Sequence, residues 1–182
     1  MFAELIEKLG EILGEREIPY MIIGGQAVLL YGEPRLTRDI DIILGIGAEG
    51  FQDILGITKK IGLRPIPEDI GAFVGQTMVL PMADDTTGIR VDFIFSFTPY
   101  EHEAIRRSRK VRVGASEVSF ASPEDVIIHK IFAGRPRDLE DVRGIILKNP
   151  DIDEAYIRKW LEEFERSSCE CGFVEVFQTI SK

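Results

Sequence analysis

The chain has 182 residues, the length of one domain or of one domain with a helical appendage. Hydrophobic residues make up 45% of it, enough for a buried core, and no apolar run is long enough to cross a membrane. Lys and Arg number 22 against 31 Asp and Glu, so the net charge is −9, which argues against broad, non-specific binding of nucleic acid. The first residues carry acids and lack the basic region of a signal peptide, so we expect a cytoplasmic protein.

The first half of the chain alternates between amphipathic helices and short apolar strands. Apolar residues at helical spacing predict the helices, and apolar runs bounded by turn residues predict the strands. The expected elements are a helix over 2–16, a strand over 20–23, a helix over 26–31, a strand over 39–44 and a helix over 49–61.

The rest of the chain is predicted to add strands and then to become helical. Ser122-Pro123 followed by two acids is a strong helix start, because Ser caps the first turn and Pro suits its first position. The expected elements are strands over 77–82 and 90–95 around a hairpin at 84–88, a short strand pair over 110–113 and 118–120, and helices over 123–132, 136–147 and 153–165. We therefore predict an α+β fold, with an α/β core over 1–121 and a helical region over 122–182 packed on it.

Two acids, Asp39 and Asp41, begin the second predicted strand and precede an apolar run. Since side chains alternate along a strand, both carboxylates point to the same face. Neighbouring carboxylates repel each other and are costly to desolvate, which makes sense if a cation lies between them. Carboxylate oxygens are the ligands that Mg²⁺ prefers, and Mg²⁺ commonly accompanies substrate phosphates. The alternative is a strand start with exposed acids, paired with Arg35 or Arg38.

Two further features are consistent with phosphate chemistry. Gly24-Gly25 joins a strand to a helix, so a phosphate can approach the backbone and the free N–H groups of the helix start; a tight connection is the alternative. Asp92 is a lone acid in another apolar strand, either a salt-bridge partner or a third carboxylate. If its strand lies beside 39–44, the three acids share a face and can hold two magnesium ions for displacement at phosphorus.

Basic residues near Lys130, including Arg135 and Arg137, are placed to meet a nucleotide. The alternative for Lys130 is a lysine on a solvated helix face. Asp138 and Asp141 lie one helical turn apart, and a structural role, pairing with nearby arginines, is at least as well supported as a catalytic one.

The order of these features resembles the nucleotidyltransferase superfamily of the DNA polymerase β type. Its signature is a hydrophobic residue, Gly, then Gly or Ser, a spacer of about a dozen residues, and Asp-x-Asp or Asp-x-Glu between hydrophobic residues. Ile23-Gly24-Gly25 and Asp39-Ile40-Asp41-Ile42 match it, and Asp92 fits the third acid. The segments 123–130 and 134–141 resemble the helical region of the AbiEii-like, minimal nucleotidyltransferases. The resemblance covers about residues 5–148.

The resemblance implies a nucleotidyltransferase fold with a mixed sheet flanked by helices, a nucleoside triphosphate as substrate and two Mg²⁺ ions. Asp39, Asp41 and Asp92 are the implied metal ligands and catalytic residues, with Asp92 helping to deprotonate the acceptor hydroxyl. The implied nucleotide contacts are Gly24, Gly25, Gln26, Thr37, Arg38 and Lys130. Gln26 departs from the pattern, since many family members carry a small hydroxyl residue there that binds phosphate.

Three functions are compatible with this pattern. The first is an active enzyme that moves a nucleoside monophosphate to a hydroxyl on tRNA, a protein or a small molecule. The second is a toxin-like enzyme silenced by an antitoxin, in which the basic segment 106–112 contacts RNA or is only a solvated helix end. The third is an inactive nucleotide-binding or partner-binding module.

The C-terminal part of the chain adds little to these functions. The helix over 153–165 carries Trp160 and Phe164 and either forms a dimer or partner surface or caps the core. Cys169 and Cys171 have no second cysteine pair, so we expect free thiols and not a zinc site.

Overall fold

The computed structural model describes residues 1–167 and 172–182. The expectation for Cys169 and Cys171 lies outside these residues. In chain order the elements are α1 (Phe2–Glu15), β1 (Tyr20–Ile23), α2 (Gly24–Tyr31), β2 (Asp39–Leu44), η1 (Ala48–Gly50), α3 (Phe51–Lys60), β3 (Leu63–Pro65), α4 (Ile70–Thr77), β4 (Val79–Asp84), β5 (Arg90–Phe95), α5 (Pro99–Arg106), β6 (Arg109–Val113), β7 (Ser116–Phe120), α6 (Pro123–Ala133), α7 (Pro136–Lys148), α8 (Glu154–Ser167) and α9 (Phe173–Ile180).

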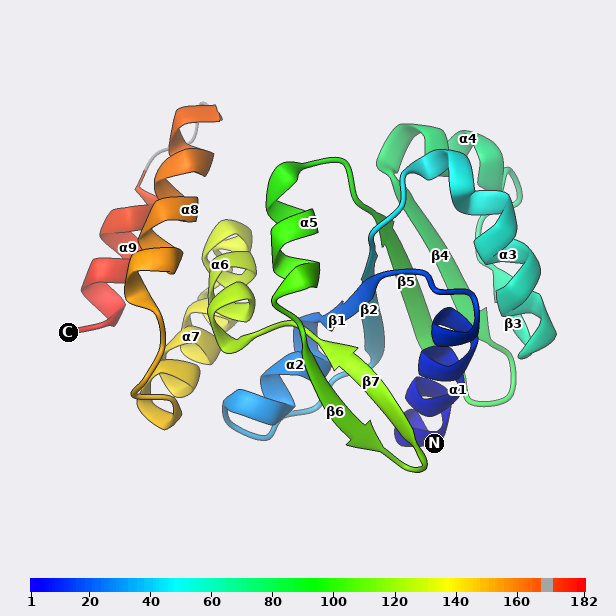
Figure 1. The fold of residues 1–182 in the computed structure, drawn as a ribbon, viewed down its shortest axis with the longest axis horizontal. Coiled ribbons are helices and arrows are strands. Elements are labelled where there is room, and N and C mark those ends of the chain that lie inside the picture. The colour runs from blue at the N-terminus through cyan, green and yellow to red at the C-terminus, as the bar shows by residue number, and fades with distance from the viewer. Residues whose placement is uncertain (168–171) are drawn as a thin grey trace.

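A mixed sheet of seven strands forms the centre of the described structure, in the order β3-β4-β5-β2-β1-β7-β6. Strand β2 pairs antiparallel with β1 and parallel with β5. Figure 1 shows α6, α7, α8 and α9 gathered at one side of the molecule and α3 and α4 at the other, with the sheet between them. The predicted α+β class with a mixed, helix-flanked sheet is confirmed.

The sheet owes its stability to strands that are apolar on both faces at their centres. Ile40, Ile42, Ile43 and Leu44 of β2 are all at most 1% exposed. Fully burying one such side chain contributes about 1.5–3 kcal/mol, so β2 is a rigid base for the two acids at its start. The first residues of β2 are less buried than its end, which leaves those acids accessible.

The helices after β7 pack on one another and on α2. Helix α6 packs against α2, α7 and α8, and α9 packs against α8. Ile157 and Leu161 of α8 and Phe177 of α9 are fully buried. Figure 1 shows that this group of helices lies beside α2, the helix that begins at Gly24. No helix of the described residues is both long and apolar enough to pass through a bilayer.

The structure also corrects several predicted boundaries. Helix α2 begins at Gly24 and not at Gln26, and β4 begins at Val79 and not at Thr77. The second difference arises because Thr77 ends α4 and Met78 takes a left-handed conformation that closes that helix. The sequence analysis did not predict the elements β3, α4, α5 and α9.

Candidate active site

The two predicted acid-bearing strands lie side by side, and their register brings the acids together. Strands β2 and β5 are parallel neighbours in which Asp41 lies opposite Asp92 and Asp39 opposite Arg90. Asp41 also lies opposite Ile23, the last residue of β1. Side chains alternate along a strand, so Asp39, Asp41 and Asp92 share one face of the sheet. This is the condition under which the sequence analysis expected the three acids to act together.

Gly24 and Gly25 allow the start of α2 to approach these acids. Gly24 has a φ of +64°, and a Cβ there would lie 2.0 Å from Asp41 Oδ2. A Cβ on Gly25 would lie 2.3 Å from Thr37 Oγ1. Both positions therefore require glycine, because any larger residue would displace the side chains beside them.

The start of α2 has the properties of a helix end that can bind an anion. No side chain of residues 1–167 or 172–182 caps it, and its first turn contains no acidic residue. Its first N–H groups are thus free of side-chain partners, and the helix dipole adds partial positive charge at the same end. These are the properties that the sequence analysis attributed to the Gly24-Gly25 turn.

Two hydrogen-bonding residues hold the beginning of β2 in place. The Gln26 amide Nε2 donates to the Asp39 carbonyl oxygen over 3.4 Å. The Thr37 hydroxyl donates to Asp39 Oδ1 over 3.1 Å. Gln26 is only 7% exposed, and its side-chain amide hydrogen-bonds to the backbone of β2. Arg38 is exposed beside them.

Asp41 experiences the electrostatic strain that adjacent acids produce. Burial, and then the charges of Asp39 and Asp92, raise the pKa of Asp41 from 3.8 to about 6, against a smaller lowering by Lys130 and Arg90. A carboxylate whose ionised form is disfavoured by neighbouring carboxylates gains most from a bound cation. The donor set consists of hard carboxylate oxygens, which suits Mg²⁺.

Asp92 lies opposite Asp41 and also forms an ion pair with a neighbouring arginine. Arg90 Nε donates to Asp92 Oδ1 over 2.8 Å, while the Arg90 side chain is 52% exposed. Asp92 is therefore both a salt-bridge partner of Arg90 and the third acid on the face of the sheet that carries Asp39 and Asp41. In the described parts of the chain, no three acidic, His or Cys side chains converge into a preformed metal site. The fit to Mg²⁺ rests on the Asp39 and Asp41 pair, with Asp92 across from it.

Lys130 is fixed in place by two buried acids of α7. Its Nζ lies 2.6 Å from Asp138 Oδ1 and 3.0 Å from Asp141 Oδ2, and all three residues are under 9% exposed. Arg35 pairs with Asp141 and Arg135 with Asp138, at 3.0 and 2.5 Å. Burial opposes the ionisation of Asp138, but hydrogen bonds from Arg135 and Lys130 hold its pKa below the ordinary value. The solvated-face alternative for Lys130 is wrong, and so is the pairing of Arg35 with Asp39 or Asp41.

A cavity of about 230 Å³ joins the two acids of β2 with the cations around Lys130, and Asp92 is not among its lining residues. Its walls come from the start of α2, the start of β2 and the junction between α6 and α7. They are formed by Gly24, Gly25, Arg35, Asp39, Asp41, Lys130, Arg135, Arg137 and Asp138. Four cations thus face three acids in one small, polar space. All of these residues except Arg35 were singled out from the sequence as site residues or as charges near the site, whereas Arg35 was expected only as a partner for the two acids of β2.

The basic segment 106–112 is distributed over two elements. Arg106 ends α5 and pairs with Glu103 at 2.7 Å. Arg107 stacks on the Tyr156 ring, with its Cζ 3.8 Å from the ring centroid. Arg109 begins the edge strand β6. Only Arg106, the first residue of this segment, therefore lies at a solvated helix end.

The small polar cavity lies at the end of β1, beside acids on two parallel strands and the start of α2. These features are typical of one class of protein, the nucleotidyltransferases. The chain belongs to the family described as "Nucleotidyltransferase of unknown function (DUF6036)", whose model matches residues 1–169. The resemblance to the nucleotidyltransferase superfamily is thereby confirmed at the level of fold and class, while the AbiEii-like subgroup stays a prediction. No curated protein matches the sequence.

Solved structures with the same fold include enzymes that modify antibiotics. The chain is similar to the antibiotic-resistance factor ANT(2'')-Ia, with 19% identity, 91% of each chain covered and a TM-score of 0.61. It is also similar to the lincosamide antibiotic adenylyltransferase LnuA, with 15% identity, 74% of this chain and 90% of that one covered, and a TM-score of 0.52. An antigenic nucleotidyltransferase-like protein from Paracoccidioides brasiliensis is 18% identical over 81% of this chain and 75% of its own, with a TM-score of 0.56.

Proposed function

We propose that this chain transfers a nucleoside monophosphate from a nucleoside triphosphate to a hydroxyl group of an acceptor, with Mg²⁺ bound by Asp39, Asp41 and Asp92. The observation that carries the proposal is the meeting of Asp41 and Asp92 on adjacent strands beside the uncapped start of α2. A site for a metal-bound triphosphate needs positively charged groups along the phosphate tail and acidic groups that hold the metal ion.

The residues of the cavity divide into two groups by charge. Lys130, Arg35, Arg135 and Arg137 would bind the phosphate tail together with the N–H groups at Gly24 and Gly25. The acids lie beside this tail, and Asp92 would accept the proton of the acceptor hydroxyl. Mg²⁺, when bound, would neutralise charge on the phosphates and polarise the α-phosphorus.

The bond changes follow from this arrangement. The acceptor oxygen forms a bond to the α-phosphorus, and the bond between that phosphorus and the pyrophosphate breaks. Fixed cations around the tail would stabilise the charge that develops on the leaving pyrophosphate. Lys130 suits this role because Asp138 and Asp141 hold its charge in one position.

The proposal includes the division into a core over 1–121 and a helical region over 122–182, since the cavity takes residues from both. It also includes a cytoplasmic setting, where nucleoside triphosphates are available. The acceptor classes to be screened are tRNA, protein and small molecules. ANT(2'')-Ia was solved with adenylyl-2''-tobramycin, which supports including hydroxylated small molecules. An antitoxin-like partner and a homodimer are further parts of the proposal to be tested.

Isothermal titration with each of the four nucleoside triphosphates, with and without Mg²⁺, tests the proposal. We expect at least one to bind only when Mg²⁺ is present. Asp39→Ala combined with Asp41→Ala should abolish binding without unfolding the protein, whereas Asp151→Ala, at an exposed acid between α7 and α8, should leave it unchanged. No binding of any triphosphate to the folded wild type would refute the proposal. Binding without transfer to any acceptor class would instead support the inactive nucleotide-binding module.

A further inference from the structure

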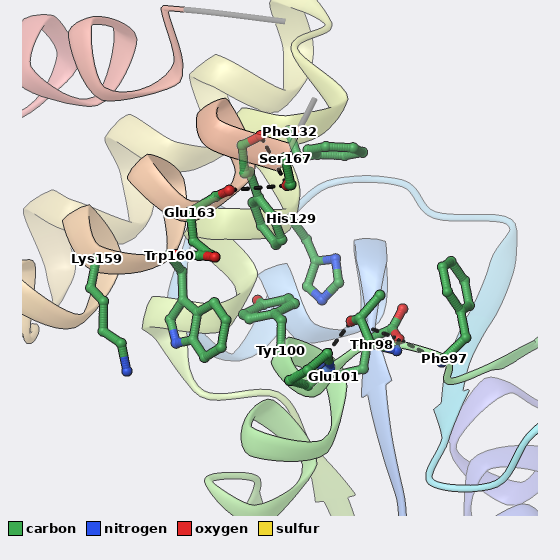
Figure 2. Close-up of a pocket in the computed structure, with 12 residues that line it drawn as sticks. Phe97, Thr98, Tyr100, Glu101, His129, Phe132, Lys159, Trp160, Glu163 and Ser167 are labelled. Atoms are coloured by element: carbon green, nitrogen blue, oxygen red, sulfur yellow. Dashed lines mark hydrogen bonds between the residues drawn. The ribbon is translucent and has the colours of Figure 1, made fainter. Parts of the chain in front are cut away.

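A second, larger cavity lies on the side of α6 away from the acids. Its volume is about 700 Å³, and its walls come from the β5–α5 connection and from helices α5, α6 and α8. Figure 2 shows His129 and Phe132 of α6 and Trp160 of α8 around the space, with Phe97 on the far side. A volume of this size is typical of sites that enclose small molecules.

This cavity is distinct from the catalytic one. The two share no lining residue within the described part of the chain. His129 and Lys130 are neighbours on α6, yet Lys130 lines the acidic cavity and His129 lines the larger one. Asp92 lies within β5, whereas Phe97 follows the end of that strand, five residues further along the chain. A ligand here would not need to occupy the space of the triphosphate.

The walls of the larger cavity are aromatic. The Tyr100 ring centroid lies 5.1 Å from those of Trp160 and Phe164 and 5.4 Å from that of His129. Such distances are typical of edge-to-face packing, which fixes the rings and leaves the cavity preformed. The side chain of Tyr100 is further held by its hydroxyl, which donates to the buried carboxylate of Asp125 over 3.2 Å.

Two exposed aromatic side chains line this cavity. Phe97 is 66% exposed and Phe132 is 51% exposed, and they lie on separate walls. Leaving two large aromatic side chains in water gives up stabilisation that a ligand between them would restore.

A polar atom without a partner adds a second observation. His129 Nε2 is buried and has no hydrogen-bond partner among the described residues. Burial, and then the charge of Lys130, lower the pKa of His129 to about 4, so the ring is neutral near pH 7. A neutral imidazole nitrogen pairs with an uncharged polar group and does not require a charged one. Buried polar atoms generally have partners, so this one indicates a missing group.

From these observations we infer that the cavity between α5, α6 and α8 binds a planar, mainly apolar aromatic small molecule, separately from the nucleotide. Its rings would pack between Phe97 and Phe132, against the wall that His129 and Trp160 line. This inference does not depend on the proposed transfer reaction, because it rests on different residues.

Trp160 makes the inference directly measurable, since it is the one tryptophan of the chain and it lines the cavity. The probe is N-phenyl-1-naphthylamine, an uncharged aromatic amine whose absorption overlaps tryptophan emission. We expect saturable energy transfer from Trp160 to one bound probe molecule. Phe97→Asp and Phe132→Asp should each weaken the probe's affinity by about tenfold or more, because each places a charge against an apolar ligand.

The matched control is Leu147→Asp on α7, at a residue that is 83% exposed and outside the cavity, and it should bind the probe as the wild type does. Thermal unfolding checks that the variants are folded, and the two phenylalanines provide independent tests because they lie on different walls. Absence of saturable energy transfer in the wild type would overturn the inference. Wild-type affinity in folded Phe97→Asp and Phe132→Asp would overturn it too, because the probe would then bind elsewhere.

Discussion

Replacing Gly24 with alanine separates the catalytic role of this glycine from its effect on stability. The added Cβ would lie 2.0 Å from Asp41 Oδ2 and 3.0 Å from Asp41 Cγ. Gly62, after α3, is the matched control: its φ of +87° is also positive, but a Cβ there meets nothing within 4 Å. Both substitutions strain the backbone, and only the first disturbs an acid of the site.

The two effects have different expected sizes. A left-handed conformation costs a residue with a Cβ about 1–2 kcal/mol relative to glycine, so both variants should lose about that much free energy of unfolding. At Gly24, the Asp41 carboxylate must also move by about 1 Å to reach a tolerable contact. A displacement of this size in a catalytic group costs on the order of 100-fold in rate.

Urea unfolding gives the stability of each variant, and titration with Mg²⁺ and nucleoside triphosphate gives its binding. We expect similar losses of stability in Gly24→Ala and Gly62→Ala, with weakened binding and turnover only in Gly24→Ala. If Gly24→Ala binds and turns over like the wild type, then the contact between Gly24 and Asp41 does not matter and the reasoning is wrong.

The remaining predictions concern charge. Because the pKa of Asp41 is raised to about 6 in the folded chain, the folded state binds more protons than the unfolded one between about pH 4 and pH 6, and stability falls as pH rises through that window. Asp41→Asn should therefore stabilise the protein by about 3 kcal/mol at pH 7 and hardly at all near pH 4, measured by urea unfolding. Equal stability of variant and wild type at pH 7 would contradict the raised pKa. Lys130→Met leaves Asp138 and Asp141 with one arginine partner each. It should lower the free energy of unfolding by about 2–3 kcal/mol and abolish triphosphate binding, whereas Lys130→Arg should recover most of the stability. An unchanged urea midpoint in Lys130→Met would show that these ion pairs contribute little to stability. The toxin-like form of the proposal predicts that expressing the chain alone arrests bacterial growth and that Asp41→Asn abolishes the arrest; continued growth with the folded wild type present would exclude it.

Much of the site could be predicted from sequence because its residues follow local rules. Alternation along β2 puts Asp39 and Asp41 on one face, and Gly24-Gly25 lies where β1 ends and a helix starts. Asp92 joins the other two acids only because β2 pairs with β5. The sequence did not predict this pairing, and the shared face of the three acids was expected only if the two strands were neighbours. That pairing joins segments about 50 residues apart, so no local pattern determines it.

The pairing of Asp138 with Arg135 was expected from the sequence, but the pairing of Lys130 with Asp138 and of Arg35 with Asp141 was not. Arg35 and Asp141 are 106 positions apart and meet because α7 packs against α2. Lys130 meets Asp138 because the chain turns back between α6 and α7. In both cases tertiary packing selects one partner from several nearby charges.

Some missed elements did have sequence signals. Thr98 and Glu101 form a capping box at the start of α5, and the spacing of these two residues predicts a helix start. Helix α4 is harder to predict, since Gly71 and Gly75 lie within it and glycine disfavours helices. Strand β3 has only three residues, too few for a periodic pattern.

The central claim is tested most directly by following the α-phosphate. The wild type and Asp41→Asn are incubated with Mg²⁺ and a triphosphate labelled at either the α- or the γ-phosphorus, together with RNA, protein and small-molecule fractions of a cell extract. The proposed reaction predicts α-label in one fraction, no γ-label, and loss of the signal in Asp41→Asn. Transfer of the γ-label in place of the α-label, or equal labelling by wild type and variant, would contradict it.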